Sequence, residues 1–313
     1  MSEIAIRTQG LTRDFPSVRA VDSLDLEIPT GVVFGFLGPN GSGKTTTVRL
    51  LLGLLEPTSG RAEVLGHDVT VDPQAVRAST GALMEHSGLY ERLTAQENLQ
   101  FFGRAAGMSR GDVKARIREL LEPLDLFDRR GEQVGTWSRG MKQKLAVARS
   151  LMHRPRVVFL DEPTAGLDPV AAAGLRDDLA RLVAEEGVTV FVNTHHLADA
   201  ERLCHQVGVV REGRLLALGH PDELRTAAGG RRLEIAGHGL GDQIREALLA
   251  MEGVLEVRPE NSRLLLDLSP DVRTPDIVRL VMEHGGEIEE VRRGSETLEE
   301  AFMSLLEGGA DAV

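Results

Sequence analysis

The sequence is poor in cysteine, aromatic residues and lysine. Among 313 residues it has one cysteine, Cys204, one tryptophan and one tyrosine, and aromatic residues make up 4% of the chain. A single cysteine excludes a disulfide within the chain and fits a reducing compartment. Lysine accounts for four of the 36 basic residues, so a motif that requires lysine rarely matches this chain by chance.

Long apolar runs are missing as well. The most apolar stretch, residues 50–55, lies between Arg49 and Glu56 and falls far short of the roughly 20 residues that a membrane-spanning helix needs. Residues 1–10 carry Glu3 and Arg7 and have no apolar core, so we expect no signal peptide. If the protein acts at a membrane, we expect another chain to supply the spanning helices.

Positive charge is outnumbered by negative charge. The chain has 36 basic and 48 acidic residues, which gives a net charge of −12 at pH 7. This negative net charge argues against nucleic acid as the main partner, although it is compatible with a local basic patch. The share of hydrophobic residues, 42%, is ordinary for a globular protein, and the length allows about two domains.

A glycine-rich segment fits the phosphate-loop pattern G-x-x-x-x-G-K-[ST]. It follows an apolar run at 32–37, which predicts a buried strand, and it precedes a helical segment at 46–52. Backbone N–H groups and the helix dipole of such a loop attract an anion. Lys44 would reach the β- and γ-phosphates of a nucleoside triphosphate, and Thr45 would ligate Mg²⁺. The alternative is a chance glycine turn. The predicted loop comprises Gly38, Pro39, Asn40, Gly41, Ser42, Gly43, Lys44, Thr45 and Thr46.

An acidic pair, Asp161 and Glu162, directly follows an apolar run at 157–160. A carboxylate at the carboxyl end of a buried strand, beside a phosphate loop, is placed to coordinate magnesium. We therefore assign Asp161 to the metal and Glu162 to the attacking water, as general base or polarising group. The competing interpretation is an acidic pair that only caps the next element.

Two further segments suggest anion chemistry. Ser138 is a good N-cap for a helix at 139–152, and Gly140 leaves backbone N–H groups open near its first turn. This predicts a second anion site without a lysine, although a plain capped helix explains the same residues. His195 follows the apolar run at 188–192 and is either catalytic or packed at a strand end.

The apolar patterns predict an α/β fold. Residues 3–30 alternate apolar and polar positions, as short antiparallel strands do, whereas the runs at 156–160 and 188–192 are typical of buried parallel strands. Residues 89–153 have a helical pattern and form an insertion. Between the two parallel strands, Asp168 caps a helix that begins at Pro169 and ends at Gly187. The prediction is a P-loop NTPase with a parallel-sheet core, an antiparallel β subdomain and a helical insertion.

A second domain begins after a boundary near 227–230. The expected elements are a strand at 232–236, a helix at 242–251, a hairpin at 254–268, a helix at 275–284, a strand at 288–292 and a helix at 298–307. This β-α-β-β-α-β order predicts a small ferredoxin-like α+β domain with a trailing helix. We expect domains at 1–225 and 226–313, the second either regulatory, dimerising or inert.

Residues 1 to about 225 resemble the ATP-binding subunit of an ABC transporter. The family's motifs occur in order: Walker A at Gly38–Thr46, the signature at Ser138–Gln143, Walker B at Val157–Glu162, the D-loop at 165–168 and the switch histidine at His195. The signature helix is the discriminating motif, because other P-loop ATPases lack it before Walker B. The chain departs from the family's usual motifs at two places. The signature reads Trp137-Ser138-Arg139-Gly140-Met141 in place of Leu-Ser-Gly-Gly-Gln, and His196 stands where an aspartate is common.

The resemblance implies that two such subunits enclose two ATP molecules head to tail. Ser138 and Gly140 would contact the γ-phosphate held by the partner subunit's Lys44, and Asp168 would belong to the same interface. Phe15 stands where the family stacks an aromatic ring on adenine, with a core phenylalanine as the alternative. Glu85 replaces the family's Q-loop glutamine and could ligate Mg²⁺ through one oxygen.

Residues 140–143 and 297–302 look like those of bacterial ABC-2-type exporters, which include drug-resistance ATPases. The resemblance implies an ATPase at the cytoplasmic face of the membrane. It would power export of a drug, antibiotic or lipid-like substrate through a permease on a separate chain, as a homodimer using ATP and Mg²⁺ and binding no nucleic acid.

Other classes fit less well. A soluble ABC ATPase of translation or DNA metabolism usually has two nucleotide domains or a coiled-coil insert, and this chain has one phosphate loop. A P-loop GTPase would need an Asn-Lys-x-Asp motif, which is missing, and a kinase does not explain the signature helix. A catalytically inactive regulatory subunit is disfavoured by Glu162.

Overall fold

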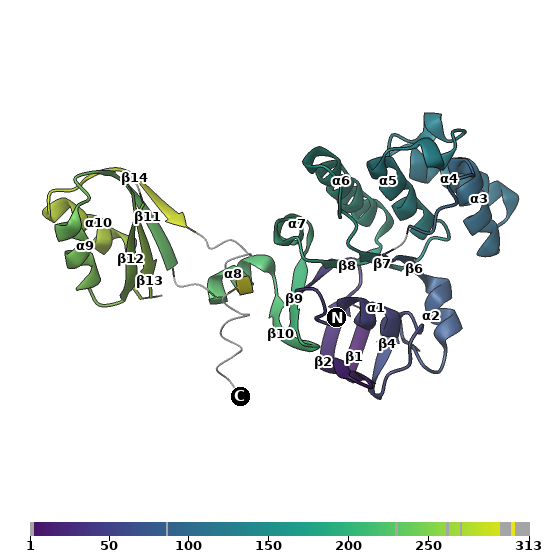
Figure 1. The fold of residues 1–313 in the computed structure, drawn as a ribbon, viewed down its shortest axis with the longest axis horizontal. Helices are drawn as coiled ribbons and strands as arrows, with labels where there is room; N and C mark the ends of the chain where they lie inside the picture. Colours follow the sequence, from purple (N-terminus) through teal and green to yellow (C-terminus); the bar gives the residue numbers. More distant parts are fainter. Residues whose placement is uncertain are drawn as a thin grey trace. The chain divides into compact units, whose positions relative to one another are not determined.

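The computed structural model describes residues 3–85, 87–228, 231–260, 263–269, 271–294 and 302–303. The chain divides into two compact units, Met1–His220 and Pro221–Val313 (Figure 1). The boundary expected from the sequence, between residues 225 and 226, falls inside the helix α8, Pro221–Ala228.

The first sheet of the larger unit is antiparallel, with the order β2-β1-β4-β5. Its strands are β1 (Ile4–Phe15), β2 (Val18–Pro29), β4 (Ser59–Val64) and β5 (His67–Asp68). β1 and β2 are 12 residues each, longer than the short strands that the sequence predicted. Bulges along their pairing absorb positions that break strict alternation, so one long ribbon forms.

The central sheet has the order β10-β9-β3-β8-β7-β6. Its strands are β3 (Val33–Leu37), β6 (Thr80–Leu83), β7 (Val157–Asp161), β8 (Thr189–Thr194), β9 (Gln206–Arg211) and the edge strand β10 (Arg214–Gly219). All pairings are parallel except that of β10 with β9. Because β3, β7 and β8 are buried along their length, their sequences are mainly apolar, and polar residues stand at the carboxyl ends of β7 and β8.

Helices surround this sheet (Figure 1). They are α1 (Lys44–Leu51), α2 (Pro73–Ser79), α6 (Pro169–Glu186) and α7 (Leu197–Leu203). The helical insertion contains α3 (Ala95–Ala105), α4 (Arg110–Leu121) and α5 (Arg139–Ser150), with short 3₁₀ turns at η1 (Phe127–Arg129) and η2 (Val134–Thr136). The predicted limits of α6 are confirmed: the Asp168 carboxylate accepts from the N–H groups of its first turn, and Gly187 ends it with φ of 63°.

The smaller unit contains α8 and a four-stranded antiparallel sheet with two helices. Its further elements are β11 (Arg231–His238), α9 (Asp242–Leu249), β12 (Val254–Glu260), β13 (Arg263–Leu268), α10 (Thr274–Glu283) and β14 (Glu287–Gly294). The strand order β12-β13-β11-β14 brings the first and third strands together at the centre, as the predicted β-α-β-β-α-β arrangement requires. The helix expected at 298–307 lies outside the described residues, apart from residues 302 and 303.

Among the helices that the structure describes, none combines the length and apolar character needed to cross a membrane.

Candidate functional site

A cavity of about 580 Å³ lies at the carboxyl ends of β3, β6 and β7. Parallel strands bring the residues that follow them to one edge of the sheet, which is where α/β proteins bind ligands. The lining comes from five places in the sequence: Val18 and Ala20; Asn40, Gly41, Gly43, Lys44, Thr45 and Thr46; Leu83, Met84, Glu85 and Ser87; Arg139 and Gln143; and Asp161, Glu162 and Ala165.

The phosphate loop turns the chain from β3 into α1. The N-cap of α1, Gly43, has φ of 97°, and a Cβ at this position would lie 2.1 Å from the carbonyl oxygen of Ala20. Only glycine fits so close an approach. The first N–H groups of α1 have no partner within the helix, and they carry the positive end of its dipole. The loop therefore has the geometry of an anion site.

Two side chains of the loop are arranged for a phosphate. The Lys44 Nζ donates to the carbonyl oxygens of Gly38 at 2.6 Å and Pro39 at 3.0 Å, so the ammonium group lies across the loop. Burial lowers the pKa of Lys44, and the charges of Glu162 and Asp161 oppose this shift. The Ser42 Oγ is buried without a hydrogen-bond partner among the described residues. A nucleotide phosphate would supply the hydrogen-bond acceptor that Ser42 lacks, and it would offer Lys44 charged oxygens in place of the two carbonyl oxygens.

The predicted metal ligands Thr45 and Asp161 lie side by side. The Thr45 Oγ1 donates to Asp161 Oδ2 at 3.1 Å, and the Asn193 Nδ2 donates to Asp161 Oδ1 at 3.2 Å. Burial raises the pKa of the Asp161 carboxyl group, and these two hydrogen bonds partly offset the shift. A hydroxyl and a carboxylate oxygen are ligands that Mg²⁺ prefers, so the donor set fits this ion.

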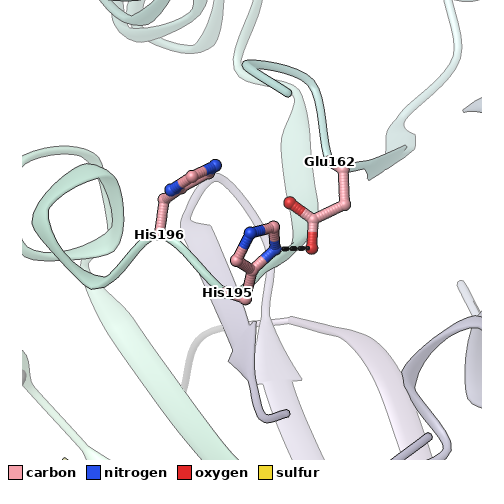
Figure 2. A group of neighbouring side chains, drawn as sticks. All are labelled: Glu162, His195 and His196. Carbon is pink, nitrogen blue, oxygen red and sulfur yellow. Dashed lines mark hydrogen bonds and ion pairs between the residues drawn. The ribbon is translucent and has the colours of Figure 1, made fainter. Parts of the chain in front are cut away.

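Glu162 and His195 are in direct contact. The Nδ1 atom of His195 lies 2.7 Å from Glu162 Oε1, and Figure 2 shows the imidazole turned toward the carboxylate. The Thr194 Oγ1 donates to the other carboxylate oxygen at 3.4 Å. Glu162 has φ of 49°, an uncommon conformation for a residue with a side chain, so the chain turns sharply where β7 ends.

His196 follows directly in sequence, and its ring centroid lies 4.2 Å from that of His195 (Figure 2). One ligand atom from each of Glu162, His195 and His196 lies within 4.8 Å of the others. This arrangement could also hold a transition-metal ion.

Two residues predicted from the family resemblance lie near the cavity rather than deep in it. Glu85 is exposed and forms part of the lining. Phe15 is 38% exposed, so the alternative of a core phenylalanine is wrong. It pairs across the β1–β2 hairpin with Val18, which lines the cavity, and the Arg13 guanidinium lies 4.8 Å from the centre of its ring.

The signature segment is confirmed as a helix start, with Ser138 as the N-cap of α5 that accepts from the Met141 N–H. Ser138 and Gly140 do not line the cavity of their own chain, whereas Arg139 does. The Arg139 Nη2 donates to the Ala165 carbonyl oxygen at 2.9 Å, which links the signature segment to the residues after β7. The Asp168 side chain is occupied as the cap of α6 and does not line the cavity.

Sequence reasoning missed three polar residues of the site. Asn193 and Thr194 end the buried strand β8 and hold the two carboxylates, and Gln143 reaches the cavity from α5. The signal for the first two was present, because polar residues at the carboxyl end of an apolar run belong to the same sheet edge as Asp161. The position of Gln143 depends on how α5 packs, which a sequence pattern does not give.

Comparison with known proteins agrees with this geometry. A family model described as "ABC transporter" matches residues 21–165, and one for the C-terminal domain of DrrA1-3-like ATP-binding proteins matches residues 219–306. The daunorubicin resistance ATP-binding protein DrrA3 of Streptomyces coeruleorubidus is 40% identical over 97% of this chain and 96% of its own length. The bacitracin transport ATP-binding protein BcrA of Bacillus licheniformis is 34% identical over 97% of this chain and 98% of its own length.

Solved structures share the fold of the larger unit. The ATP-binding subunit of an ABC transporter superimposes with a TM-score of 0.64 at 29% identity, over 71% of this chain and 92% of its own. The structure of cbiO1 from Clostridium perfringens gives a TM-score of 0.67 at 24% identity, over 80% of this chain and 96% of its own. A match that extends over nearly the full length of several such subunits shows the family: the chain belongs to the ATP-binding subunits of ABC transporters and is an ATPase.

Proposed function

We propose that this ATPase powers the export of a drug, antibiotic or lipid-like substrate through a membrane permease on a separate chain. The observation that carries the proposal is the match of residues 219–306 to the C-terminal domain of DrrA1-3-like proteins. The ATPase domain is common to many transporters, whereas this second domain is shared with relatives named for daunorubicin resistance. BcrA, named for bacitracin transport, is also similar along its whole length.

The chemistry is in-line attack of water on the γ-phosphate of ATP. Glu162 would orient the water and take its proton, and His195, held by the Glu162 carboxylate, would lie beside the transferred phosphoryl group. Lys44 would leave the carbonyl oxygens of Gly38 and Pro39 to bind phosphate oxygens. Thr45, Asp161 and Glu85 would hold Mg²⁺, which neutralises charge on the phosphates when it is bound.

Dimerisation would complete the site. The exposed Ser138 and the half-buried Gly140 lie at the N-terminus of α5, outside their own cavity. The open N–H groups and positive dipole end of this 12-residue helix attract an anion. In a head-to-tail pair they would face the phosphate held by the partner subunit's Lys44. Phe15 would stack on adenine at the edge of the same cavity.

An aromatic cluster offers a surface for the permease. Tyr90 and Phe101 are each 47% exposed, their ring centroids are 5.1 Å apart, and Phe102 packs 5.2 Å from Phe101. Tyr90 lies five residues after Glu85, and Phe101 lies in α3. Exposed apolar clusters of this kind are typical of protein contacts. Docking here would place the ATPase peripherally at the cytoplasmic face of the membrane and couple ATP turnover to the permease.

The proposal can be tested in the source cells by replacing Glu162 with glutamine in the chromosomal gene. We expect intracellular accumulation of at least one drug in a panel of antibiotics, daunorubicin and bacitracin included, to rise to the level found in a gene deletion. A matched strain with Tyr90→Ser and Phe101→Ser should accumulate the drug to the same level. The purified Tyr90→Ser, Phe101→Ser protein should still hydrolyse ATP. Unchanged accumulation across the panel, with the protein sedimenting with ribosomes, would contradict the proposal.

A further inference from the structure

The helical insertion contains a second cavity, of about 840 Å³, that shares no lining residue with the ATP site. It lies between α3 and α4, which pack side by side (Figure 1), and extends to η1. Its lining includes Arg104, Arg110, Lys114, Arg118 and Arg130 and no carboxylate. We refer to these five basic residues and the cavity that they line as the α3–α4 basic groove. It contrasts with the net charge of −12 of the whole chain.

The spacing of the charges on α4 is unfavourable for the helix alone. Arg110, Lys114 and Arg118 are four residues apart and therefore lie on one face. Like charges at this spacing destabilise a helix by about 0.2–0.5 kcal/mol for each pair. Arg118 forms an ion pair with Glu122, at 3.4 Å. In the part of the chain that the structure describes, Arg104, Arg110 and Lys114 form no ion pair.

Two guanidinium groups of the groove pack on the same aromatic ring, that of Phe127. The Arg130 group lies 4.1 Å and the Arg118 group 4.8 Å from the centre of the Phe127 ring. The Arg130 Nη1 also donates to the Phe127 carbonyl oxygen at 2.8 Å. Packing on an aromatic ring leaves the edges of a guanidinium group free for an anion and reduces the entropy that binding costs.

The floor of the groove is apolar, with the buried Val113 and Ile117 among its lining residues. Positive side chains above a floor that excludes water attract an anion more strongly than scattered surface charges do, because the effective dielectric constant is lower. The volume is within the range of sites for small molecules. Arginine side chains in particular match the geometry of phosphate oxygens.

We propose that the α3–α4 basic groove binds a ligand with several phosphate groups. Two sources carry this chemistry: a soluble phosphorylated metabolite and the headgroup of an anionic phospholipid. Either ligand would offset the repulsion along α4 and would bind to the same insertion that carries Tyr90 and Phe101. ATP bound at the phosphate loop would not be the ligand of the groove, because the two cavities share no lining residue.

Binding to the full-length protein tests the proposal, with Mg·ADP saturating the phosphate loop and salt at physiological concentration. One arm titrates inositol hexakisphosphate by calorimetry. The other measures sedimentation with phosphatidylcholine vesicles that contain cardiolipin. The test variant is Arg110→Gln with Lys114→Gln. The matched control is Arg61→Gln with Arg202→Gln, which removes the same charge from exposed positions outside the groove.

We expect the groove variant to bind the phosphate probe at least about tenfold more weakly, because each lost charge-assisted hydrogen bond costs about that factor. The control should bind like the wild type. Binding of the hexakisphosphate supports a soluble ligand, and binding of cardiolipin vesicles alone supports a headgroup. Without phosphate ligands, the groove variant should melt no lower than the wild type, since it relieves like-charge repulsion.

Three results would overturn the proposal. The first is that neither probe binds to the wild-type protein. The second is an equal loss of affinity in the control variant, which would mean that only overall charge matters. The third is binding of an acidic peptide without phosphate groups as strong as that of the hexakisphosphate, which would mean that the groove selects negative charge and not phosphate.

Discussion

Arg116 brings a full charge into the interior of the helical insertion, where its side chain is 1% exposed. Its Nη1 and Nη2 atoms bind the two carboxylate oxygens of Glu186 at 2.8 and 2.7 Å. Nη2 also donates to the Leu151 carbonyl oxygen at 2.9 Å, and Nη1 lies 3.2 Å from Glu119 Oε2. One side chain of α4 thus ties the insertion to the ends of α5 and α6.

Replacing Arg116 with methionine would keep the apolar stem and remove all four contacts. Glu186, 21% exposed, would lose its partner, and the Leu151 carbonyl would lose a donor. Breaking one half of a buried ion pair costs about 3–5 kcal/mol, so we expect the free energy of unfolding to fall by that amount. Urea unfolding measured by tryptophan fluorescence checks this. Trp137 is the one tryptophan and is 5% exposed, so the signal reports the ATPase unit alone.

Arg118→Met provides the matched control on the same helix. Arg118 is exposed, and its ion pair with Glu122, at 3.4 Å, is a surface pair worth less than about 1 kcal/mol. Equal losses in the free energy of unfolding for Arg116→Met and Arg118→Met, or a loss below about 1 kcal/mol for Arg116→Met, would show that the buried ion pair does not stabilise the fold.

Three further predictions follow from burial and close approach. Gly43→Ala should abolish ATP binding, because its Cβ would lie 2.1 Å from the Ala20 carbonyl oxygen. Gly41→Ala should lose less ATP affinity, because no atom lies within 4 Å of its Cβ. Nucleotide titration distinguishes the two variants. Asp161→Asn should raise the melting temperature of the nucleotide-free protein at pH 7 while stopping hydrolysis. Burial raises the pKa of Asp161 in the folded state, so its ionisation destabilises the fold as the pH rises above 3.8. The gain should therefore disappear below pH 3.8, and a gain that persists there would contradict this cause. Cys204 is buried with its pKa raised to about 12, so it should resist thiol reagents at pH 8 until the protein unfolds, and rapid labelling of the native protein would contradict this burial.

The local features of the fold could be predicted from the sequence because each has a local physical cause. The glycines and Lys44 of the phosphate loop, the apolar runs of β7 and β8, and the capping of α6 by Asp168 and Gly187 depend on neighbouring residues alone. The same holds for the strand and helix order of the C-terminal unit, where alternation and turn residues recur at short intervals.

The contacts between distant segments could not be predicted. The hydrogen bonds of Asp161 with Thr45 and Asn193 depend on the order β3-β8-β7 in the sheet, which is not the order in the chain. The length of β1 depends on bulges that keep its pairing with β2 through irregular positions. The Arg116 interaction joins residues 70 positions apart.

The contact of Glu162 with His195 shows the same division. The sequence predicted each residue at the end of a buried strand, and adjacent strands necessarily bring such ends together. It did not predict the direct contact between the His195 Nδ1 atom and a carboxylate oxygen of Glu162, because the direction of the Glu162 side chain depends on the positive φ of that residue. The basic groove was also missed, although the four-residue spacing of Arg110, Lys114 and Arg118 was visible.

In the dimer that we propose, ATP closes two subunits, with the signature helix of one against the phosphate held by the other. The most direct test is the mass of the Glu162→Gln protein by light scattering, with and without Mg·ATP, since removing the base should leave ATP bound and uncleaved. We expect the monomer mass without nucleotide and twice that mass with Mg·ATP. When Ser138→Arg is added, we expect a protein that still binds ATP but stays a monomer. A monomer at saturating ATP, or an ATP-dependent dimer that persists with Ser138→Arg, would contradict it.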